Sequence, residues 1–320
     1  MKEKFSNIQV IRALCIIAVV TIHTCPSGQI GIFLRPFLNF CVAIFIFLSG
    51  YLTKMPIEDK SKFIKKRLIR ITPPYIIWSI IYTVIYSDYD NFILKFLTAR
   101  CCGIYYYIFV YIQMILLTFI IISLINKKLK YILYAITPLA IVFLYITNIM
   151  GYKIPFPYNA ILFPMWISYY VIGIIIGNKK NTISLSLKSA IIMYSIGIVL
   201  QIIEGQIWNY FDNYNMATTQ IKLSNFITNI GVIFIISNLL NKEFNTNKKI
   251  YNILVTMGDY SFGIYLTHMI LVSIFNKISS SIIDIPFSIT TILILTIEYF
   301  GMSLCYKIFN AKTLKILGLK

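Results

Sequence analysis

Residues 10–24 read VIRALCIIAVVTIHT, an apolar run that carries Arg12 near its start and His23 near its end. The run is apolar enough to enter a bilayer, where ionisable side chains are costly and therefore mark candidate functional sites. The two residues are eleven positions apart, which at about 100° per residue amounts to about three helical turns. Arg12 and His23 are therefore predicted to project from one face of one helix, about 16 Å apart along its axis.

The composition is that of a membrane protein. The chain is 58% hydrophobic and 12% charged, with a mean hydropathy of +0.79, whereas soluble domains are about 45–50% apolar and about 25% charged. A net charge of +18 could suggest a nucleic-acid partner. The basic residues instead form short clusters between apolar stretches, as the positive-inside rule requires, so we expect no nucleic-acid binding.

Ten apolar stretches have spanning length, and each predicts one transmembrane helix. They lie near residues 8–24, 32–52, 71–87, 103–125, 131–150, 158–177, 187–203, 223–240, 253–275 and 283–306. We therefore expect an all-α polytopic membrane protein with about ten transmembrane helices in a single bundle. Residues 1–320 are expected to form one membrane domain, with no separate soluble domain.

The basic residues also predict the orientation in the membrane. Cytoplasmic segments carry an excess of Lys and Arg, and most of the 29 basic residues fall on the same side as the N-terminus. Both termini are therefore predicted to be cytoplasmic. The six basic residues left on the outer side are Arg35, Lys95, Arg100, Lys153, Lys222 and Lys277.

The second span ends in FIFLSGYL, residues 45–52, which places Ser49 and Gly50 near its cytoplasmic end. Small residues let helix backbones approach closely in membranes, so packing is one interpretation. The other is a backbone opening beside a cofactor, which glycine permits because it has no Cβ. The spacing alone favours packing and leaves the second interpretation open.

A basic segment, KSKFIKKRLIR at residues 60–70, precedes the third span. Most of its charges fit an anchor against anionic lipid. Arg67 and Arg70, however, are three positions apart on one helical face, where two guanidinium groups would suit bidentate capture of phosphate. Pro73 and Pro74 are predicted to open the third transmembrane helix, where a missing N–H costs nothing.

Two further ionisable residues lie within the last two spans. His268 is the only histidine besides His23, and the sequence leaves open whether it is a packing residue or a functional one. An unpaired carboxylate at the depth of Glu298 would be costly, so we expect it to be protonated, or paired with Arg12 or a histidine. The six cysteines show no CxxC pair and no metal-ligand spacing, so no metal site is predicted.

Four motifs occur together along the chain: Arg12-x10-His23, Ser-Gly-Tyr at residues 49–51, Arg67-x-x-Arg70 before Pro73-Pro74, and MGDYSFGIYLTHM at 257–269. With these motifs the chain resembles the acyltransferase 3 family of integral-membrane O-acyltransferases over nearly its whole length. In many family members an acidic residue precedes the first arginine of the pattern by three positions, and here that residue is Gln9. Arg12 must then be supported in another way.

The resemblance implies a stand-alone O-acyltransferase that uses acyl-CoA, with acetyl-CoA the expected donor, and binds no other cofactor. It implies that His23 is the catalytic base, because imidazole has an unperturbed pKa of about 6.5. The acceptor would be a hydroxyl of a cell-surface glycan or lipid-linked sugar. The resemblance also implies donor binding by Arg12, Arg67, Arg70, Ser49, Gly50 and Tyr51, and supporting roles for Tyr265, His268 and Glu298.

Two other functions remain open at this stage. One is a carrier or flippase for a lipid-linked saccharide, which the many spans and intramembrane ionisable residues suit equally well. The other is a non-catalytic membrane domain that senses a ligand. Consumption of acyl-CoA would separate the enzyme from both alternatives. The Lys-, Ile- and Asn-rich composition indicates a bacterium, so the inner membrane is the expected location.

Overall fold

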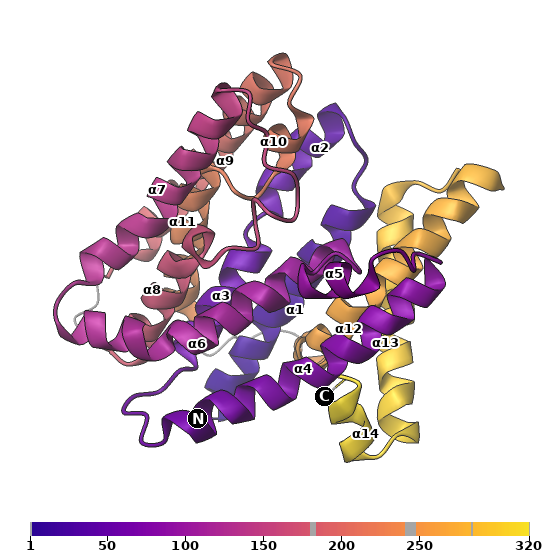
Figure 1. Ribbon diagram of the computed structural model, residues 1–320, viewed down its shortest axis with the longest axis horizontal. Helices are drawn as coiled ribbons and strands as arrows, with labels where there is room; N and C mark the ends of the chain where they lie inside the picture. The colour runs from indigo at the N-terminus through magenta and orange to yellow at the C-terminus, as the bar shows by residue number, and fades with distance from the viewer. Residues whose placement is uncertain (1, 180–183, 241–247, 283, 320) are drawn as a thin grey trace. The chain divides into compact units, whose positions relative to one another are not determined.

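The computed structural model describes residues 2–179, 184–240, 248–282 and 284–319, with only the backbone described for 2–5. Secondary structure in these residues is helical, with no strand (Figure 1). Nine segments within this part are long and apolar enough to span a membrane, which confirms the polytopic all-α prediction. They are α1 (Lys2–Thr24), α2–α3 (Gln29–Tyr51), α4 (Lys60–Ile85), η2–α6 (Gly103–Asn126), α7 (Lys130–Ile149), α9 (Leu187–Tyr210), α10–α11 (Tyr214–Leu239), α12 (Lys248–Ser281) and α13 (Phe287–Ile308).

The sixth expected span, residues 158–177, is shorter than predicted. Of residues 158–177, only α8 (Ile167–Gly177) is α-helical, and a short 3₁₀ helix, η3 (Phe163–Met165), precedes it. A helix of 11 residues extends about 16 Å, about half of the hydrocarbon thickness. Proline explains the shortfall, because Pro157 and Pro164 each lack a backbone N–H and restrict the residue before them.

The third span also begins earlier than predicted. Helix α4 starts at Lys60, where the Asp59 carboxylate caps it by accepting a 2.8 Å hydrogen bond from the Lys62 backbone N–H. Pro73 and Pro74 lie inside this helix and do not open it. Neighbouring helices make internal prolines tolerable in membrane helices by satisfying the freed backbone groups.

The second span is interrupted. It consists of α2 (Gln29–Leu34), a 3₁₀ helix η1 (Arg35–Phe37) and α3 (Cys41–Tyr51). Pro36, the second residue of η1, cannot donate a backbone hydrogen bond. Three shorter helices complete the described chain: α5 (Phe92–Leu97), α10 (Tyr214–Thr218) before α11 (Leu223–Leu239), and α14 (Ala311–Ile316).

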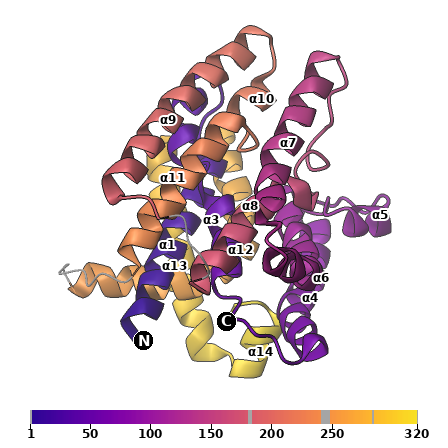
Figure 2. The same cartoon turned by 90° about the vertical axis from the view of Figure 1, so that its left-hand side faces the viewer.

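The chain divides into two compact units. The first consists of residues 1–45 and 184–320, and the second consists of residues 46–183. In the first unit, α1 packs along α12, and α13 packs against both. A second group in this unit is formed by α9, α10 and α11, and Figure 2 shows α9 and α11 side by side.

A polar core joins the elements of this second group. Gln201 of α9 is fully buried and donates hydrogen bonds to the Thr228 hydroxyl, at 2.9 Å, and to the Pro36 carbonyl, at 3.3 Å. Asn39 donates in turn to the Gln201 side-chain oxygen, at 3.3 Å. Lys222 is 1% exposed, and its amine donates to the Ala217 carbonyl at 2.9 Å.

In the second unit, α8 packs against α7 and against the end of α3. The Ser168 hydroxyl of α8 lies 3.0 Å from the Tyr134 carbonyl of α7 and donates a hydrogen bond to it. The contact with α3 is made through glycines. A Cβ on Gly50 would lie 2.1 Å from the Tyr170 carbonyl oxygen, and one on Gly173 would lie 2.2 Å from the Phe47 carbonyl oxygen. Only glycine allows this backbone approach.

Candidate active site

The first unit holds the candidate catalytic residues on a pair of helices, α1 and α12. Gln9 lies beside Gly258, and His23 lies beside His268, so the two helices run in the same direction. A Cβ on Gly258 would lie 1.9 Å from the Gln9 carbonyl oxygen. The glycine therefore allows the close contact of the two helices near their N-terminal ends. The unbroken α1 helix also carries Arg12 and His23 together, as their spacing predicts.

The two histidines of the chain face each other. The ring centroids of His23 and His268 are 5.4 Å apart, and the ring planes are inclined at 49°. His23 is half-buried in the last turn of α1, whereas His268 is fully buried in α12. The structure thus brings together two residues that are 245 positions apart in the sequence.

The hydrogen bonding of His268 fixes its tautomer. Its Nδ1 lies 2.9 Å from the Ile264 carbonyl oxygen, and a carbonyl can only accept a hydrogen bond, so the proton sits on Nδ1. The Nε2 atom is buried and has no hydrogen-bond partner. A neutral His268 therefore holds an unused lone pair on Nε2, beside His23.

Arg35 is a second group near His23 that the sequence did not single out. Its guanidinium donates a 3.5 Å hydrogen bond to the Ile22 carbonyl, and its charge acts on His23. Its Nε atom is buried without a hydrogen-bond partner. The only sequence signal was its place among the six basic residues assigned to the outer side.

Cys25 lies between the first two spans, and the pKa of its thiol depends on the positive charge of Arg35. Burial raises the pKa of the Cys25 thiol. Arg35 opposes that rise, both through its positive charge and through a hydrogen bond to the thiol. All six cysteines are free thiols in the described structure.

Arg12 is held by the residue that departs from the family pattern. Its guanidinium donates a 3.1 Å hydrogen bond to the side-chain oxygen of Gln9. The amide thus supplies an acceptor where many family members have a carboxylate. Asp259 of α12 adds an electrostatic attraction toward Arg12, so support for the arginine comes from two helices.

Glu298, which the sequence expects to be protonated or paired, has a hydroxyl as its hydrogen-bond partner. Glu298 is 4% exposed, and the residue that hydrogen-bonds to it is Thr267, neither Arg12 nor a histidine. The Thr267 hydroxyl lies 2.9 and 2.8 Å from the two carboxyl oxygens. Among the described residues the ion pair found is Lys95–Asp88. A hydroxyl thus satisfies the buried carboxyl, because Thr267 lies on the α12 face that meets α13.

Tyr265 of α12 lies beside His268. It is 8% exposed, its ring centroid is 6.4 Å from that of His268, and it stacks with Phe262 at 6.2 Å. Its place beside His268 is consistent with a supporting role.

On α1, Thr24 follows His23 directly, and its hydroxyl lies 2.6 Å from the Thr291 hydroxyl of α13. This bond ties the end of α1 that carries His23 to a second helix.

The second unit holds the other predicted residues around Arg67. One guanidinium nitrogen of Arg67 donates a 2.9 Å hydrogen bond to the Thr53 hydroxyl, and the group lies 4.4 Å from the Phe63 ring centroid. The other terminal nitrogen, Nη1, is buried without a hydrogen-bond partner. Thr53 contacts the Tyr170 hydroxyl at 3.3 Å, and Tyr170 contacts the Thr118 hydroxyl at 2.8 Å. Arg67 is thus fixed in place with one donor unused.

Arg70 differs from Arg67, because its side chain is exposed. The two arginines share α4, as predicted, but only Arg67 has an anchored side chain. The anchor itself, Thr53, was missed, since a threonine just after a span carries no recognisable signal in the sequence.

Ser49, Gly50 and Tyr51 form the end of α3. Gly50 packs against α8, which supports the packing interpretation, and Tyr51 is 4% exposed with the Lys54 amine 5.2 Å from its ring centroid. The Ser49 hydroxyl oxygen is buried and lacks a hydrogen-bond partner. Of the three residues, Ser49 has the unused polar group.

No group of His, Cys, Asp and Glu side chains suited to a metal occurs among the described residues.

The fold and these buried polar groups define a multi-pass membrane protein with ionisable side chains inside its helices. A comparison with protein families gives a match over residues 5–304, to a family described as an acyltransferase domain. The chain belongs to this acyltransferase 3 family and is a membrane acyltransferase. Comparisons with curated proteins and with solved structures find no match.

Proposed function

We propose that this chain is a bacterial inner-membrane O-acyltransferase that moves an acyl group, acetyl in the first instance, from cytoplasmic acyl-CoA to a sugar hydroxyl. The acceptor is a cell-surface glycan or a lipid-linked saccharide. The observation that carries the proposal is the His23–His268 pair on α1 and α12, in a chain of this family. Membrane lipid surrounds the protein, and nucleic acid has no part in its function.

His23 acts as the general base. It accepts the proton of the acceptor hydroxyl while the oxygen attacks the thioester carbonyl, so that a C–O bond forms and a tetrahedral oxyanion develops. The C–S bond then breaks, and the proton on His23 passes to the departing sulfur of CoA. The unused Nε2 lone pair of His268 supports this role, because it can accept a hydrogen bond from an imidazolium at His23.

Arg35 stabilises the negative charge of the tetrahedral oxyanion. A cation beside the base suits this role, because preorganised charge directed at a developing oxyanion lowers the barrier. The buried, unpartnered Nε atom of Arg35 supports it.

Arg67 contacts the phosphates of the donor. This assignment is supported by the Nη1 nitrogen of Arg67, which has no hydrogen-bond partner. The hydrogen bond from the other terminal nitrogen to Thr53 holds the guanidinium in place. Donor binding also involves the other residues that the family resemblance implies, namely Ser49, Gly50, Tyr51, Arg70 and Arg12. Ser49 contributes its unpartnered hydroxyl.

The test uses inverted membrane vesicles that contain the full chain and radiolabelled acetyl-CoA. Wild-type vesicles are expected to transfer label to a glycan or lipid fraction, and His23→Ala is expected to lower the rate by at least about 10²-fold. Equal amounts of inserted protein, with matched thermal stability, serve as the control. Undiminished transfer by His23→Ala would exclude His23 as the base. Binding of acetyl-CoA without consumption by the wild type would favour the ligand-sensing domain.

A further inference from the structure

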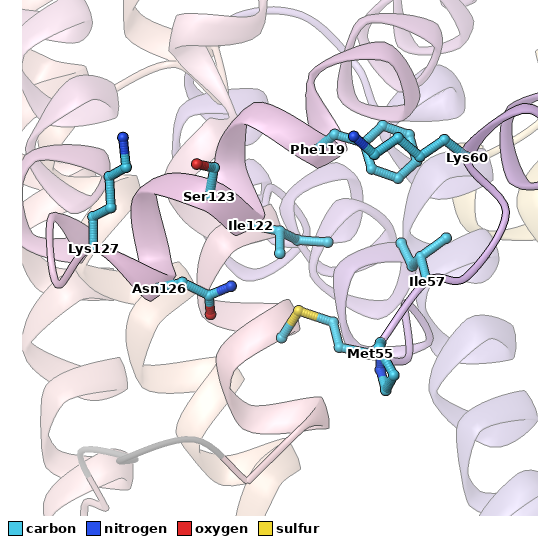
Figure 3. A pocket seen from close by; sticks show the side chains of 9 residues that line it. Met55, Ile57, Lys60, Phe119, Ile122, Ser123, Asn126 and Lys127 are labelled. Carbon is cyan, nitrogen blue, oxygen red and sulfur yellow. The ribbon is translucent and has the colours of Figure 1, made fainter.

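A groove lies in the second unit, beside the end of α6. Its volume is about 650 Å³, and its walls are the loop at residues 55–57 and the last turns of α6 (Figure 3). In Figure 3 the side chains of Met55 and Ile57 face those of Ile122 and Asn126. The groove is thus formed by two segments of one compact unit.

The loop wall of the groove is anchored to the C-terminal end of α8. Asn178 accepts a 2.9 Å hydrogen bond from the Met55 backbone N–H and donates one, also of 2.9 Å, to the Thr53 carbonyl. The Lys54 amine donates to the Gly177 carbonyl at 2.7 Å. These three bonds hold the loop from both sides of Lys54, so the groove exists before any ligand arrives.

The lining combines apolar side chains with positive charge. Met55, Ile57 and Ile122 supply the apolar surface, and Lys60 and Lys127 supply two exposed ammonium groups. The Lys60 amine lies 5.5 Å from the Phe119 ring centroid, over the ring.

No acidic residue lines the groove. Glu58 and Asp59 follow on the same loop, but the Asp59 carboxylate is engaged in capping α4, and Glu58 is exposed. A ligand that matches this lining carries an anionic group beside an apolar chain.

The position of the groove favours a lipid over a nucleotide. Both of its basic segments, 54–70 and 127–130, belong to the side where positive charges concentrate and where anionic headgroups lie. Leu116 and Ile120 continue, away from the groove, the row of α6 that carries Ser123 and Lys127, and they are 52% and 57% exposed. An acyl chain that leaves the groove can therefore follow an exposed apolar stripe at helical spacing.

We propose that this groove binds an anionic phospholipid. The anionic headgroup lies in the groove, which Lys60 and Lys127 flank at its two ends, and the glycerol lies on Ile57 and Ile122. An acyl chain leaves the groove past Ser123. The chain then follows α6 along Ile120 and Leu116. This lipid site is independent of the proposed acyl transfer, because it requires no donor and uses none of the residues assigned to catalysis.

The test is native mass spectrometry of the purified full chain in a neutral detergent, with added phosphatidylglycerol or phosphatidylcholine. The wild type is expected to retain phosphatidylglycerol in preference. Lys60→Gln with Lys127→Gln is expected to weaken that binding by about tenfold or more, because each basic residue near an anionic lipid contributes a several-fold gain in affinity. The matched control, Lys65→Gln with Lys128→Gln, makes the same change of charge outside the groove and is expected to stay within about twofold.

Two further measurements separate the lipid from other ligands. Ile122→Trp fills the groove without changing its charge and is expected to lower phosphatidylglycerol binding. Glycerophosphoglycerol, the headgroup without acyl chains, is expected to compete poorly. An equal loss in the control pair, or no loss with Ile122→Trp, would show that the attraction is diffuse and overturn the proposal. Displacement of the lipid by equimolar coenzyme A would assign the groove to a nucleotide and overturn it as well.

Discussion

The imidazole rings of His23 and His268 lie with their centroids 5.4 Å apart, on two helices that run in the same direction. The Nδ1–H of His268 is committed to the Ile264 carbonyl, which leaves its Nε2 lone pair beside His23. A half-buried base thus has a fully buried second base as its neighbour. In the proposed mechanism His23 is the group that meets the substrate, and His268 acts through His23.

His268→Asn tests whether His268 acts through His23. Asparagine can keep a donor near the position of Nδ1 but lacks the Nε2 lone pair, so we expect kcat to fall at least about tenfold while the protein stays folded. The acid limb of the kcat–pH profile is expected to move, because the environment of the base changes. A profile identical to that of the wild type would reduce His268 to a packing residue.

Arg67→Lys tests the donor contact in the second unit. Lysine keeps the charge but loses the planar fork that contacts Thr53 and leaves Nη1 available, so the KM for acyl-CoA is expected to rise about tenfold or more. Thr53→Val removes the anchor and is expected to act in the same direction. Lys65→Arg, on the same helix and exposed, is the matched control, because it also exchanges one basic side chain for the other at constant charge. An unchanged KM in Arg67→Lys would argue against a phosphate contact.

Gly258→Ala tests the close approach of α1 and α12. The added methyl group would lie 1.9 Å from the Gln9 carbonyl oxygen, so the helices must separate, at a cost of about 1–3 kcal/mol in the free energy of unfolding. Gly301→Ala is the matched control, since nothing lies within 4 Å of its added Cβ. That variant is expected to change stability by no more than about 1 kcal/mol. Thermal unfolding in one detergent compares the two, and equal midpoints would contradict the contact.

Alkylation of Cys25 tests the neighbouring arginine in a chain whose other cysteines are replaced by alanine. Burial raises the pKa of the thiol and Arg35 opposes the rise, so Arg35→Gln should raise the pKa further. The thiolate is the reactive form. Labelling by a maleimide at pH 8 should therefore be slower in Arg35→Gln than in the parent, and the rates should converge as the pH rises. Faster labelling at pH 8 would contradict the contact.

Much of the fold could be predicted from apolar stretches and their flanks. Nine stretches of spanning length correspond to nine described segments that can cross a membrane. The errors occur where local backbone chemistry acts within an apolar run. Pro157 and Pro164 shorten the expected helix at 158–177 to α8, and Pro73 and Pro74 are accommodated inside α4.

The candidate site could be predicted only in part. The spacing of Arg12 and His23 indicates a shared face because one helix carries both, whereas the pairing of His23 with His268 joins distant parts of the sequence. The Thr267–Glu298 contact and the place of Arg35 beside His23 likewise depend on how helices pack. Periodicity within a single helix carries no information about such contacts.

The buried amine of Lys222 has a consequence for the cooperativity of the fold. Burying a charge is costly unless the group is hydrogen-bonded, and here the amine donates to the carbonyls of Ala217 and Gln201, at 2.9 and 3.4 Å. Gln201 belongs to α9, so this acceptor is present only when α9 is packed against the segment that carries Lys222. Separation of α9 from that segment would leave the buried charge with one acceptor fewer. The lysine therefore couples the folding of the two segments, so that neither is stable in its buried position without the other.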